Sequence, residues 1–308
     1  MKQTYLVTGG AGFIGSHIAE YLVQEGHEVR IIDNLSSGRK ENLSDFIDEI
    51  EFIEGSILDK ALLEKAMNGV DIVFHQAARP SVPVSINDPL GTNETNITGT
   101  LMVFEVAHKA GVKRVVYASS SSVYGDSPTL PKVETMVTNP LSPYAAQKMM
   151  CEKYGKLYSD IFGLETVGLR YFNVFGPRQN PDSEYAAVIP KFIKKIKAGE
   201  PVTIFGDGET SRDFTYIDNV VHGNICAGNA ESVSGEVFNI ALGDEISLND
   251  LVKRIDAICD TETDITYEDF RAGDVKHSCA DITKAKEKLS FEPSIPFDEG
   301  LQKTSETL

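Results

Sequence analysis

The stretch TGGAGFIG at residues 8–15 decides the fold of this chain. It directly follows a strand-like apolar segment, 5–7, and it opens a segment with apolar residues at helical spacing, 15–24. Its glycines are spaced GxxGxxG: Gly9 permits a tight turn, Gly12 lets the backbone approach a pyrophosphate, and Gly15 lets helix and sheet pack closely. The N-terminus of the helix behind this turn offers amide donors to phosphates. The stretch therefore predicts a dinucleotide-binding turn.

Short apolar segments alternate with helical patterns through the first half of the chain. The clearest helical patterns cover 96–110 and 144–162. Strand-like segments lie at 5–7, 28–33, 51–54, 71–75, 114–118 and 166–170. Near-continuous apolar strands that alternate with helices are typical of parallel sheets buried on both faces. We therefore predict an α/β protein with a Rossmann-type doubly wound parallel sheet.

The rhythm of the sequence changes after about residue 173. Helical patterns at 187–198 and 247–258 flank a strand-like segment at 202–205, and Pro, Gly and Asp become frequent. We expect residues 1–172 to form the dinucleotide-binding domain, with later segments near 214–240 returning to it. Residues 173–308 then form mostly a smaller mixed α/β substrate lobe.

The composition excludes several classes of function. The chain has 308 residues and a formal charge of −17, which argues against nucleic-acid binding and against docking on an anionic membrane. It contains no long apolar run and no signal-peptide pattern. Its four cysteines form no CxxC and its six histidines no HxxxH, so we expect no metal site, reduced thiols and a cytoplasmic location.

Asp33 ends the second strand-like segment, 24 residues after Gly9. A carboxylate in this place accepts hydrogen bonds from both ribose hydroxyls of an adenosine and repels a 2′-phosphate. It favours NAD over NADP as the cofactor. Arg39 and Lys40, a few residues later, keep NADP open as the alternative.

Tyr144 and Lys148 form a YxxxK pair on one face of a predicted helix. A tyrosine hydroxyl has an ordinary pKa of about 10 and is a poor base at neutral pH. A neighbouring ammonium and the positive nicotinamide ring of NAD would stabilise the phenolate. The pair therefore predicts a general acid–base, Tyr144, tuned by Lys148, which also anchors the ribose. The serine run at 119–122 ends the fifth strand-like segment, where ligands of parallel sheets bind.

With these elements in place, the chain resembles the extended short-chain dehydrogenase/reductase family. More narrowly, it resembles the NAD-dependent UDP-sugar 4-epimerases, above all the UDP-N-acetylglucosamine 4-epimerases. The matching motifs run along nearly the whole chain: TGGAGFIGSH (8–17), DN (33–34), HQAA (75–78), NITGT (96–100), SSSSVYG (119–125), SPYAAQK (142–148), LRYFNVFGPRQ (169–179), YAAVIP (185–190), GDGETSRDF (206–214) and RAGDVKHSCAD (271–281).

The resemblance implies a role for each matching residue. Ser120 joins Tyr144 and Lys148 as a catalytic residue. The residues implied to bind NAD are Gly9, Gly12, Phe13, Ile14, Gly15, Asp33, Asn34, Ser37, Gly38, Ser56, Ile57, Gln76, Ala77, Ala78, Asn96, Tyr144, Lys148 and Tyr171. Those implied to bind the UDP-sugar are Ser81, Ser120, Ser122, Tyr144, Asn173, Gln179, Ala187, Val188, Thr203, Phe205, Arg212, Arg271, Asp274 and Ser278. Among them, Arg212 and Arg271 would clamp the diphosphate, since planar guanidinium groups suit that task.

Small residues bear on the choice of sugar. Ser278 stands where bulk decides whether an N-acetyl group fits, and Ala187 is small as well; with Ser81 and Gln179 they favour UDP-GlcNAc and UDP-GalNAc. A UDP-glucose/UDP-galactose 4-epimerase, or an enzyme of dual specificity, is the alternative within the family. Ser121 and Ser122 lack the acidic pair that a related dehydratase would need. A non-catalytic NAD-sensing regulator is a further alternative, but it would be expected to lose Tyr144 or the arginines.

Two residues depart from the family pattern. Ser56 replaces the usual Asp that contacts the adenine amine, and Pro80 stiffens the loop that faces the sugar. The sequence therefore does not decide the adenine contact at Ser56 or the sugar contact near Pro80.

The resemblance also implies a mechanism and an assembly. Tyr144 takes the proton of the sugar 4-hydroxyl while tightly bound NAD takes the C4 hydride. The transient 4-keto sugar then turns and is reduced on its other face. The expected assembly is a homodimer in which the helices carrying Asn96 and Tyr144 pair into a four-helix bundle.

Overall fold

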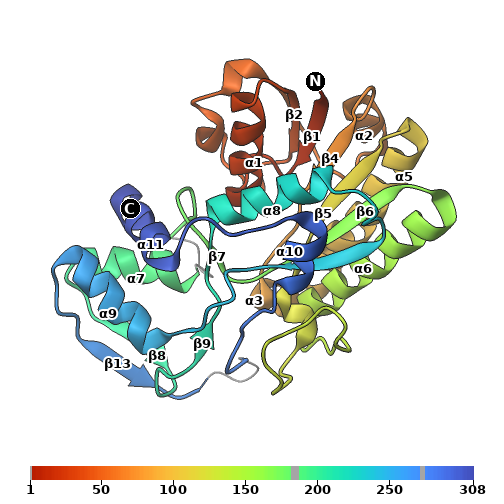
Figure 1. Ribbon diagram of the computed structural model, residues 1–308. Helices are drawn as coiled ribbons and strands as arrows, with labels where there is room; N and C mark the ends of the chain where they lie inside the picture. The colour runs from red at the N-terminus through yellow and green to blue at the C-terminus, as the bar shows by residue number, and fades with distance from the viewer. Residues whose placement is uncertain (1, 182–186, 271–274) are drawn as a thin grey trace.

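The computed structural model describes residues 2–181, 187–270 and 275–308. At its centre lies a seven-stranded sheet in the order β11–β6–β5–β4–β1–β2–β3 (Figure 1). Every neighbouring pair in it is parallel. The strands are β1 (Thr4–Thr8), β2 (Glu28–Asp33), β3 (Ile50–Glu54), β4 (Ile72–His75), β5 (Arg114–Ser120), β6 (Glu165–Tyr171) and β11 (Glu236–Ile240).

Helices cover both faces of the sheet. On one face α1 (Phe13–Gln24) packs against α8 (Ile217–Asn229). On the other, α2 (Lys60–Ala66) and α6 (Pro143–Phe162) both pack against α5 (Thr100–Ala110). Each face has its own apolar cluster, which explains the near-continuous apolar strands of the sequence. The predicted Rossmann-type α/β fold is confirmed.

The order of the strands reverses at β1. From β1 the chain runs outward to β2 and β3, and then it crosses back to β4 on the other side of β1. In such sheets ligands bind in the crevice beyond the carboxyl ends of the strands at this switch point. The glycine turn that follows β1 lies there.

A smaller mixed lobe lies beside the carboxyl ends of the strands (Figure 1). Among the described residues it contains two of the three two-stranded sheets and the helices α7 (Val188–Lys197), α9 (Leu248–Cys259) and α11 (Phe297–Thr307). The first sheet pairs β8 (Val202–Phe205) with β13 (Ile265–Glu268), and the second pairs β9 (Ser211–Arg212) with β12 (Ile246–Ser247). The remaining elements are η1 (Lys40–Leu43), η2 (Ile47–Glu49), α3 (Val82–Asn87), α4 (Pro89–Asn93), η3 (Glu94–Gly99), η4 (Ser121–Tyr124), β7 (Val174–Phe175), β10 (Thr215–Tyr216) and α10 (Thr283–Leu289).

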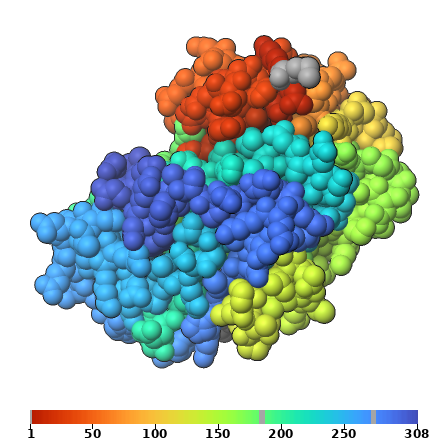
Figure 2. All heavy atoms as spheres, in the orientation of Figure 1, coloured from red at the N-terminus to blue at the C-terminus, as the bar shows by residue number. Residues whose placement is uncertain are grey.

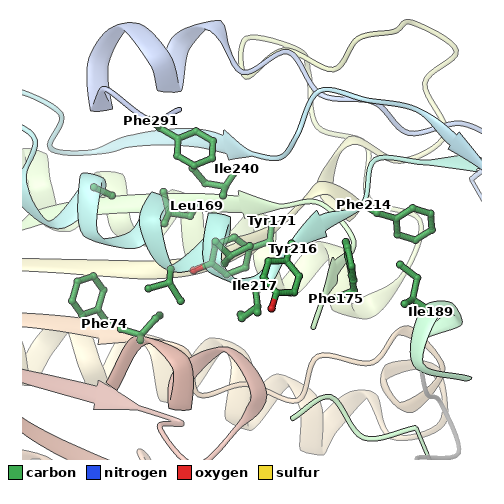
Figure 3. Close-up of a cluster of buried hydrophobic side chains, with 14 of the residues drawn as sticks. Phe74, Leu169, Tyr171, Phe175, Ile189, Phe214, Tyr216, Ile217, Ile240 and Phe291 are labelled. Atoms are coloured by element: carbon green, nitrogen blue, oxygen red, sulfur yellow. The ribbon is translucent and has the colours of Figure 1, made fainter. Parts of the chain in front are cut away.

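One apolar cluster joins the sheet to this lobe. Figure 3 shows it running from Phe74 and Leu169 in the sheet to Phe175, Phe214 and Ile189 in the lobe. In Figure 2 the α8 segment (cyan) correspondingly lies between the N-terminal part of the chain (red) and its C-terminal part (blue). The lobe is therefore packed on the sheet through a shared core. The division at residues 172 and 173 stays a prediction, although β11 does return to the sheet from the second half.

The helix expected over 96–110 differs from the observed one. A π-helical turn, η3, covers Glu94–Gly99, and the α-helix begins only at Thr100. The Thr100 hydroxyl donates to the Asn96 carbonyl at 2.6 Å, and the Cys151 thiol donates to the same oxygen at 3.1 Å. A π-helical turn differs from an α-helix in its i→i+5 bonding, which a periodic pattern of apolar residues does not distinguish.

The described part of the chain holds no helix long and apolar enough to cross a membrane. Nor do three or more His, Cys, Asp or Glu side chains meet in it as a metal site would require.

Candidate active site

A cavity of about 1380 Å³ opens beyond the carboxyl ends of β1, β2, β4 and β5. It brings most of the predicted site residues together. Those that line it are Gly9, Gly12, Phe13, Ile14, Gly15, Asp33, Asn34, Ser37, Gly38, Ser56, Ile57, Gln76, Ala77, Ala78, Ser120, Ser122, Tyr144, Lys148, Tyr171, Asn173, Gln179, Ala187, Arg212 and Ser278. Five predicted residues lie off its wall: Ser81, Asn96, Val188, Thr203 and Phe205. Arg271 and Asp274 lie outside the described residues.

The glycine turn forms a tight cradle. Gly9 has a φ of +68°, and a Cβ there would come within 2.7 Å of the Ala77 backbone. A Cβ on Gly15 would collide with the Gly9 carbonyl oxygen. Gly15 is thus needed for the turn to fold against its own helix, whereas the sequence suggested helix–sheet packing. Gly12 precedes α1 as its N-cap without a side-chain cap, so no side chain competes for the amide end of the helix.

Asp33 lies at the carboxyl end of β2 and faces the cavity. Its Oδ2 accepts the Ala11 amide at 3.0 Å and its Oδ1 the Leu35 amide at 2.8 Å. Burial raises the pKa of this carboxyl, and the two amides oppose the shift. A Cβ on Gly38 would come within 2.8 Å of Oδ2. The carboxylate is therefore held in one orientation, as recognition of a ribose requires.

Tyr144, Lys148 and Ser120 meet where α6 passes the end of β5. The Lys148 ammonium donates to the Ala118 carbonyl at 2.8 Å and lies 5.9 Å from the centre of the Tyr144 ring. Burial raises the pKa of Tyr144 to about 12, and a hydrogen bond with Ser120 opposes this shift. Ser120 Oγ accepts both the amide and the hydroxyl of Ser122, at 3.2 and 2.9 Å. Its own proton is therefore left for the phenol oxygen or for a substrate.

The loop after β4 is held by two side chains that the sequence assigned to NAD binding, Asn96 and Gln76. Asn96 accepts the Arg79 amide at 2.8 Å and donates to the Arg79 carbonyl at 3.2 Å and to Gln147 Oε1 at 2.8 Å. It fixes the loop from behind and does not line the cavity. Gln76 Nε2 donates to the Tyr171 hydroxyl at 3.1 Å and to Asn224 Oδ1 at 3.2 Å, which ties β4 to β6 and α8.

Small and polar residues line another part of the cavity wall. Ser278 is buried but borders the cavity, and the exposed Ala187 borders it just before α7. Gln179 Nε2 donates to the Val174 carbonyl at 3.2 Å. Its Oε1 is buried and has no hydrogen-bond partner among the described residues. A buried carbonyl oxygen left in this state suits a ligand that donates a hydrogen bond.

Asn173 and Arg212, which also line the cavity, are oriented by the main chain. Asn173 Nδ2 donates to the Asp213 carbonyl at 3.1 Å. Arg212 Nη1 donates to the carbonyls of Ser211 and Lys276 at 2.8 and 3.2 Å.

The other predicted substrate residues, which do not line the cavity, lie within secondary structure or cap it. Ser81 accepts the Val84 amide at 3.3 Å as the N-cap of α3. Thr203 and Phe205 share the less buried face of β8, and Val188 is the first residue of α7.

The sequence missed an apolar wall and a basic residue. Val82, Pro83 and Ile86 of α3 line the cavity with Pro80. A Ser N-cap followed by Pro in the first turn is a signal that could have found this short helix. Arg178 also lines the cavity, has a φ of +66° and pairs with Glu20 at 2.6 Å.

The chain is similar to known proteins along nearly its whole length. A family model described as the NAD dependent epimerase/dehydratase family matches residues 5–241. A UDP-N-acetylglucosamine 4-epimerase from Methanobrevibacter ruminantium, solved with UDP-N-acetylmuramic acid, is 45% identical; the match covers 100% of this chain and 98% of that one, with a TM-score of 0.95. A UDP-glucose 4-epimerase from Thermotoga maritima, solved with UDP-glucose, is 40% identical over 99% and 98% of the two chains, with a TM-score of 0.94. A putative UDP-glucose 4-epimerase of Methanocaldococcus jannaschii is 40% identical over 97% of this chain and 96% of its own length.

Proposed function

The chain belongs to the NAD-dependent epimerase/dehydratase family and uses NAD, and on this premise we propose that it is a UDP-sugar 4-epimerase that interconverts UDP-GlcNAc and UDP-GalNAc. The observation that carries the choice of sugar is Ser278, a small side chain on the cavity wall. Ala187 and Gln179 line the same cavity, and Gln179 Oε1 has no hydrogen-bond partner among the described residues. An N-acetyl group needs room and an acceptor for its N–H, and we expect these residues to supply both.

The cradle fits the proposed cofactor. The turn tolerates no Cβ at Gly9 or Gly15, and it leads to an uncapped helix end that suits a pyrophosphate. Asp33 stands at the carboxyl end of the next strand, where an adenosine ribose would lie. When bound, NAD supplies a hydride acceptor and donor at the sugar C4.

Tyr144 is proposed to take and return the proton of the 4-hydroxyl. With a pKa of about 12 almost none of the phenol is ionised at neutral pH, so it needs positive charge beside it to give up its proton. The Lys148 ammonium is close enough to supply part of that charge. Ser120, whose proton is left free by Ser122, would donate a hydrogen bond to the same oxygen.

Arg212 and Asn173, which line the cavity, are proposed to hold the diphosphate together with Arg271, and Asp274 is proposed to hold the ribose of the uridine. Binding energy is then concentrated on the nucleotide, away from the reacting carbon. The sugar can turn between the two half-reactions while the nucleotide stays in place.

The experiment is an assay of the purified protein against both sugar pairs. We expect UDP-GlcNAc and UDP-GalNAc to reach the same equilibrium mixture from either side, without added NAD. Turnover of UDP-glucose and UDP-galactose alone would favour the alternative specificity within the family. Turnover of neither pair by protein that retains NAD would favour a non-catalytic regulator.

The assembly is proposed to be a homodimer formed through a four-helix bundle. The outward face of α6 carries exposed Leu157 and Ile161, and Leu90 of the neighbouring α4 is exposed as well. Apolar side chains gathered on adjacent helices are typical of such interfaces. The cytoplasmic location stays a prediction from the sequence.

A further inference from the structure

Behind the catalytic residues lies a buried ion pair that the proposed mechanism does not use. Glu152 Oε1 accepts Arg170 Nε at 2.8 Å, and its Oε2 accepts Arg170 Nη2 at 2.7 Å. The two side chains are only 7% and 4% exposed. A carboxylate and a guanidinium in this forked geometry hold each other in one orientation.

The carboxylate also holds the end of β5. Ser119 donates its hydroxyl to Glu152 Oε1 at 2.6 Å. Ser119 and Arg170 are direct neighbours across β5 and β6. One side chain of α6 therefore binds both strands at the same level of the sheet.

Each clamped residue directly precedes a residue of the candidate site. Ser119 precedes Ser120, and Arg170 precedes Tyr171; Ser120 and Tyr171 are themselves neighbours across the two strands. On α6, Glu152 lies one helical turn after Lys148. The contacts of Glu152 thus fix α6, which carries Tyr144, against β5, which carries Ser120.

We propose that Glu152, through Ser119 and Arg170, is a positioning residue that sets the Ser120 hydroxyl against Tyr144. The proposal rests on the proposed role of Tyr144 and extends it. Burial lowers the pKa of Lys148, while Cys151 and then Glu152 oppose that shift, so the carboxylate also favours the charged lysine. Glu152 touches neither substrate nor cofactor in this assignment.

The sharpest test is Ser119→Ala, because it removes the link to β5 without leaving a charge unpaired. We expect kcat to fall about 10- to 100-fold, as for a reacting group displaced by a fraction of an ångström to an ångström. KM for the UDP-sugar and the content of bound NAD should stay at wild-type values. Ser119→Thr keeps a hydroxyl and should restore most of kcat. The assay uses whichever UDP-hexose pair the wild-type protein turns over.

Thr166→Val is the matched control. The Thr166 hydroxyl also joins β6 to α6, through the Gly155 carbonyl at 2.7 Å, but away from the site. We expect the control to lower the melting temperature as much as Ser119→Ala does and to leave kcat unchanged. Wild-type kcat in Ser119→Ala, or an equal loss of kcat in both variants, would overturn the proposal.

A second pair of variants tests the carboxylate itself. Glu152→Gln should lower kcat, whereas Glu165→Gln, which loosens the ion pair of Arg114 at the other end of the same two strands, should not. If Glu152→Gln does not fold, the Ser119 variants still decide the matter. Tyr144→Phe is measured alongside: full activity in that variant would refute the role of Tyr144, separately from the positioning by Glu152.

Discussion

The Tyr144 hydroxyl lies among buried groups, and its burial raises the pKa to about 12. This is opposite to what a base at neutral pH needs. The sequence predicted the tyrosine and its lysine partner, because YxxxK places them one helical turn apart. It could not predict the size of the burial effect, which depends on the packing of α6 against β5 and is opposed by the hydrogen bond with Ser120. A base at this position therefore needs positive charge beside it.

Ser278 should act as a steric gate for the sugar. Its side chain borders the cavity while remaining buried, so a larger residue there can only extend into the cavity or displace its neighbours. We expect Ser278→Tyr to lower kcat/KM for UDP-GlcNAc at least tenfold more than for UDP-glucose, a difference of about 1.4 kcal/mol. Steady-state kinetics on both substrates measure this. Ser278→Ala is the control for the hydroxyl and should keep both activities. An equal loss on both substrates in Ser278→Tyr would show that the position is no gate.

His75 should make the folded state sensitive to acid. Its Nδ1 accepts the Thr8 hydroxyl at 2.7 Å, and its Nε2 donates to Thr100 Oγ1 at 2.9 Å, because the Thr100 proton is already given to the Asn96 carbonyl. Burial lowers the pKa of this imidazole to about 3, from an ordinary value near 6.5. Below pH 6.5 the unfolded chain therefore binds a proton that the folded chain does not. The neutral His75 imidazole therefore contributes fully to the free energy of unfolding above pH 6.5, and this contribution is lost as the pH falls toward 3.

Urea unfolding between pH 7 and pH 4.5 tests this linkage. His75 should add a loss of about 1.4 kcal/mol for each pH unit well below 6.5. Whatever the stability of His75→Gln at pH 7, its free energy of unfolding should fall less steeply with decreasing pH than that of the wild type. Identical slopes in the wild type and His75→Gln would refute the assignment.

At the scale of elements, the sequence predicted the parallel strands closely and the irregular segments poorly. The segment 28–33 is β2 and 202–205 is β8, since their apolar patterns end at clear turn residues. Serine and asparagine roles were harder to predict. Ser81 caps a helix and Asn96 holds a loop, although serine and asparagine side chains can also bind ligands. Only the three-dimensional neighbours of such residues distinguish these roles.

The same reasoning applies to Ser119 and Glu152. The sequence placed Ser119 only within the serine run 119–122 and gave Glu152 no role. No spacing rule connects a serine on β5 to a glutamate 33 residues later, because the contact depends on how α6 lies across β5 and β6. The positions of Gly9 and Gly15, in contrast, were predictable because a Cβ at either one would collide with the backbone of the turn or of its neighbour.

The turn between β1 and α1 should fail as a cofactor cradle when Gly15 gains a side chain. The new Cβ of Gly15→Ala would collide with the Gly9 carbonyl, so either the turn or the helix must shift. Overpacking of this kind costs about 1–3 kcal/mol, and we expect the content of bound NAD to fall accordingly. Release of NAD from denatured protein, measured per mole of chain, gives the result.

Gly26→Ala is the matched control at the other end of α1. Gly26 has a φ of +79°, but a Cβ there would meet nothing within 4 Å. We expect a loss of stability of about 1 kcal/mol from the left-handed backbone and an unchanged content of NAD. Full NAD content in Gly15→Ala would show that the turn tolerates the side chain.

For the whole molecule, the net charge of −17 and the anionic ligands are reconciled by where the charges lie. Among the described residues, the cavity is lined by Arg39, Lys132, Lys148, Arg178 and Arg212 and by one acidic side chain, Asp33. The excess of acidic groups is therefore distributed over the rest of the surface. That distribution favours association with NAD and UDP-sugars at the cavity and repels polyanions elsewhere.

The exposed face of α6 should make the assembly a dimer. Leu157 is 46% exposed, Ile161 66%, and Leu90 on the adjoining α4 83%. We expect the wild-type protein to sediment at twice its chain mass of 33.7 kDa, and Leu157→Lys/Ile161→Lys to sediment as a monomer. Val137→Lys changes an apolar residue that is 90% exposed but lies outside the helices, so it should remain a dimer. A monomeric wild type at micromolar concentration would contradict the prediction.

Loss of the dimer should also reduce activity, because of how α6 is used. Its inner face carries Tyr144, Lys148 and Glu152, and its outer face would form the interface. In a monomer the outer face would be exposed to water, and the helix would be held by its contacts with the sheet alone. We therefore expect the monomeric variant to retain NAD, whose cradle lies on β1 and α1, while its kcat falls. Unchanged kcat in a proven monomer would show that the clamp between Glu152 and the strands suffices to hold the helix in place.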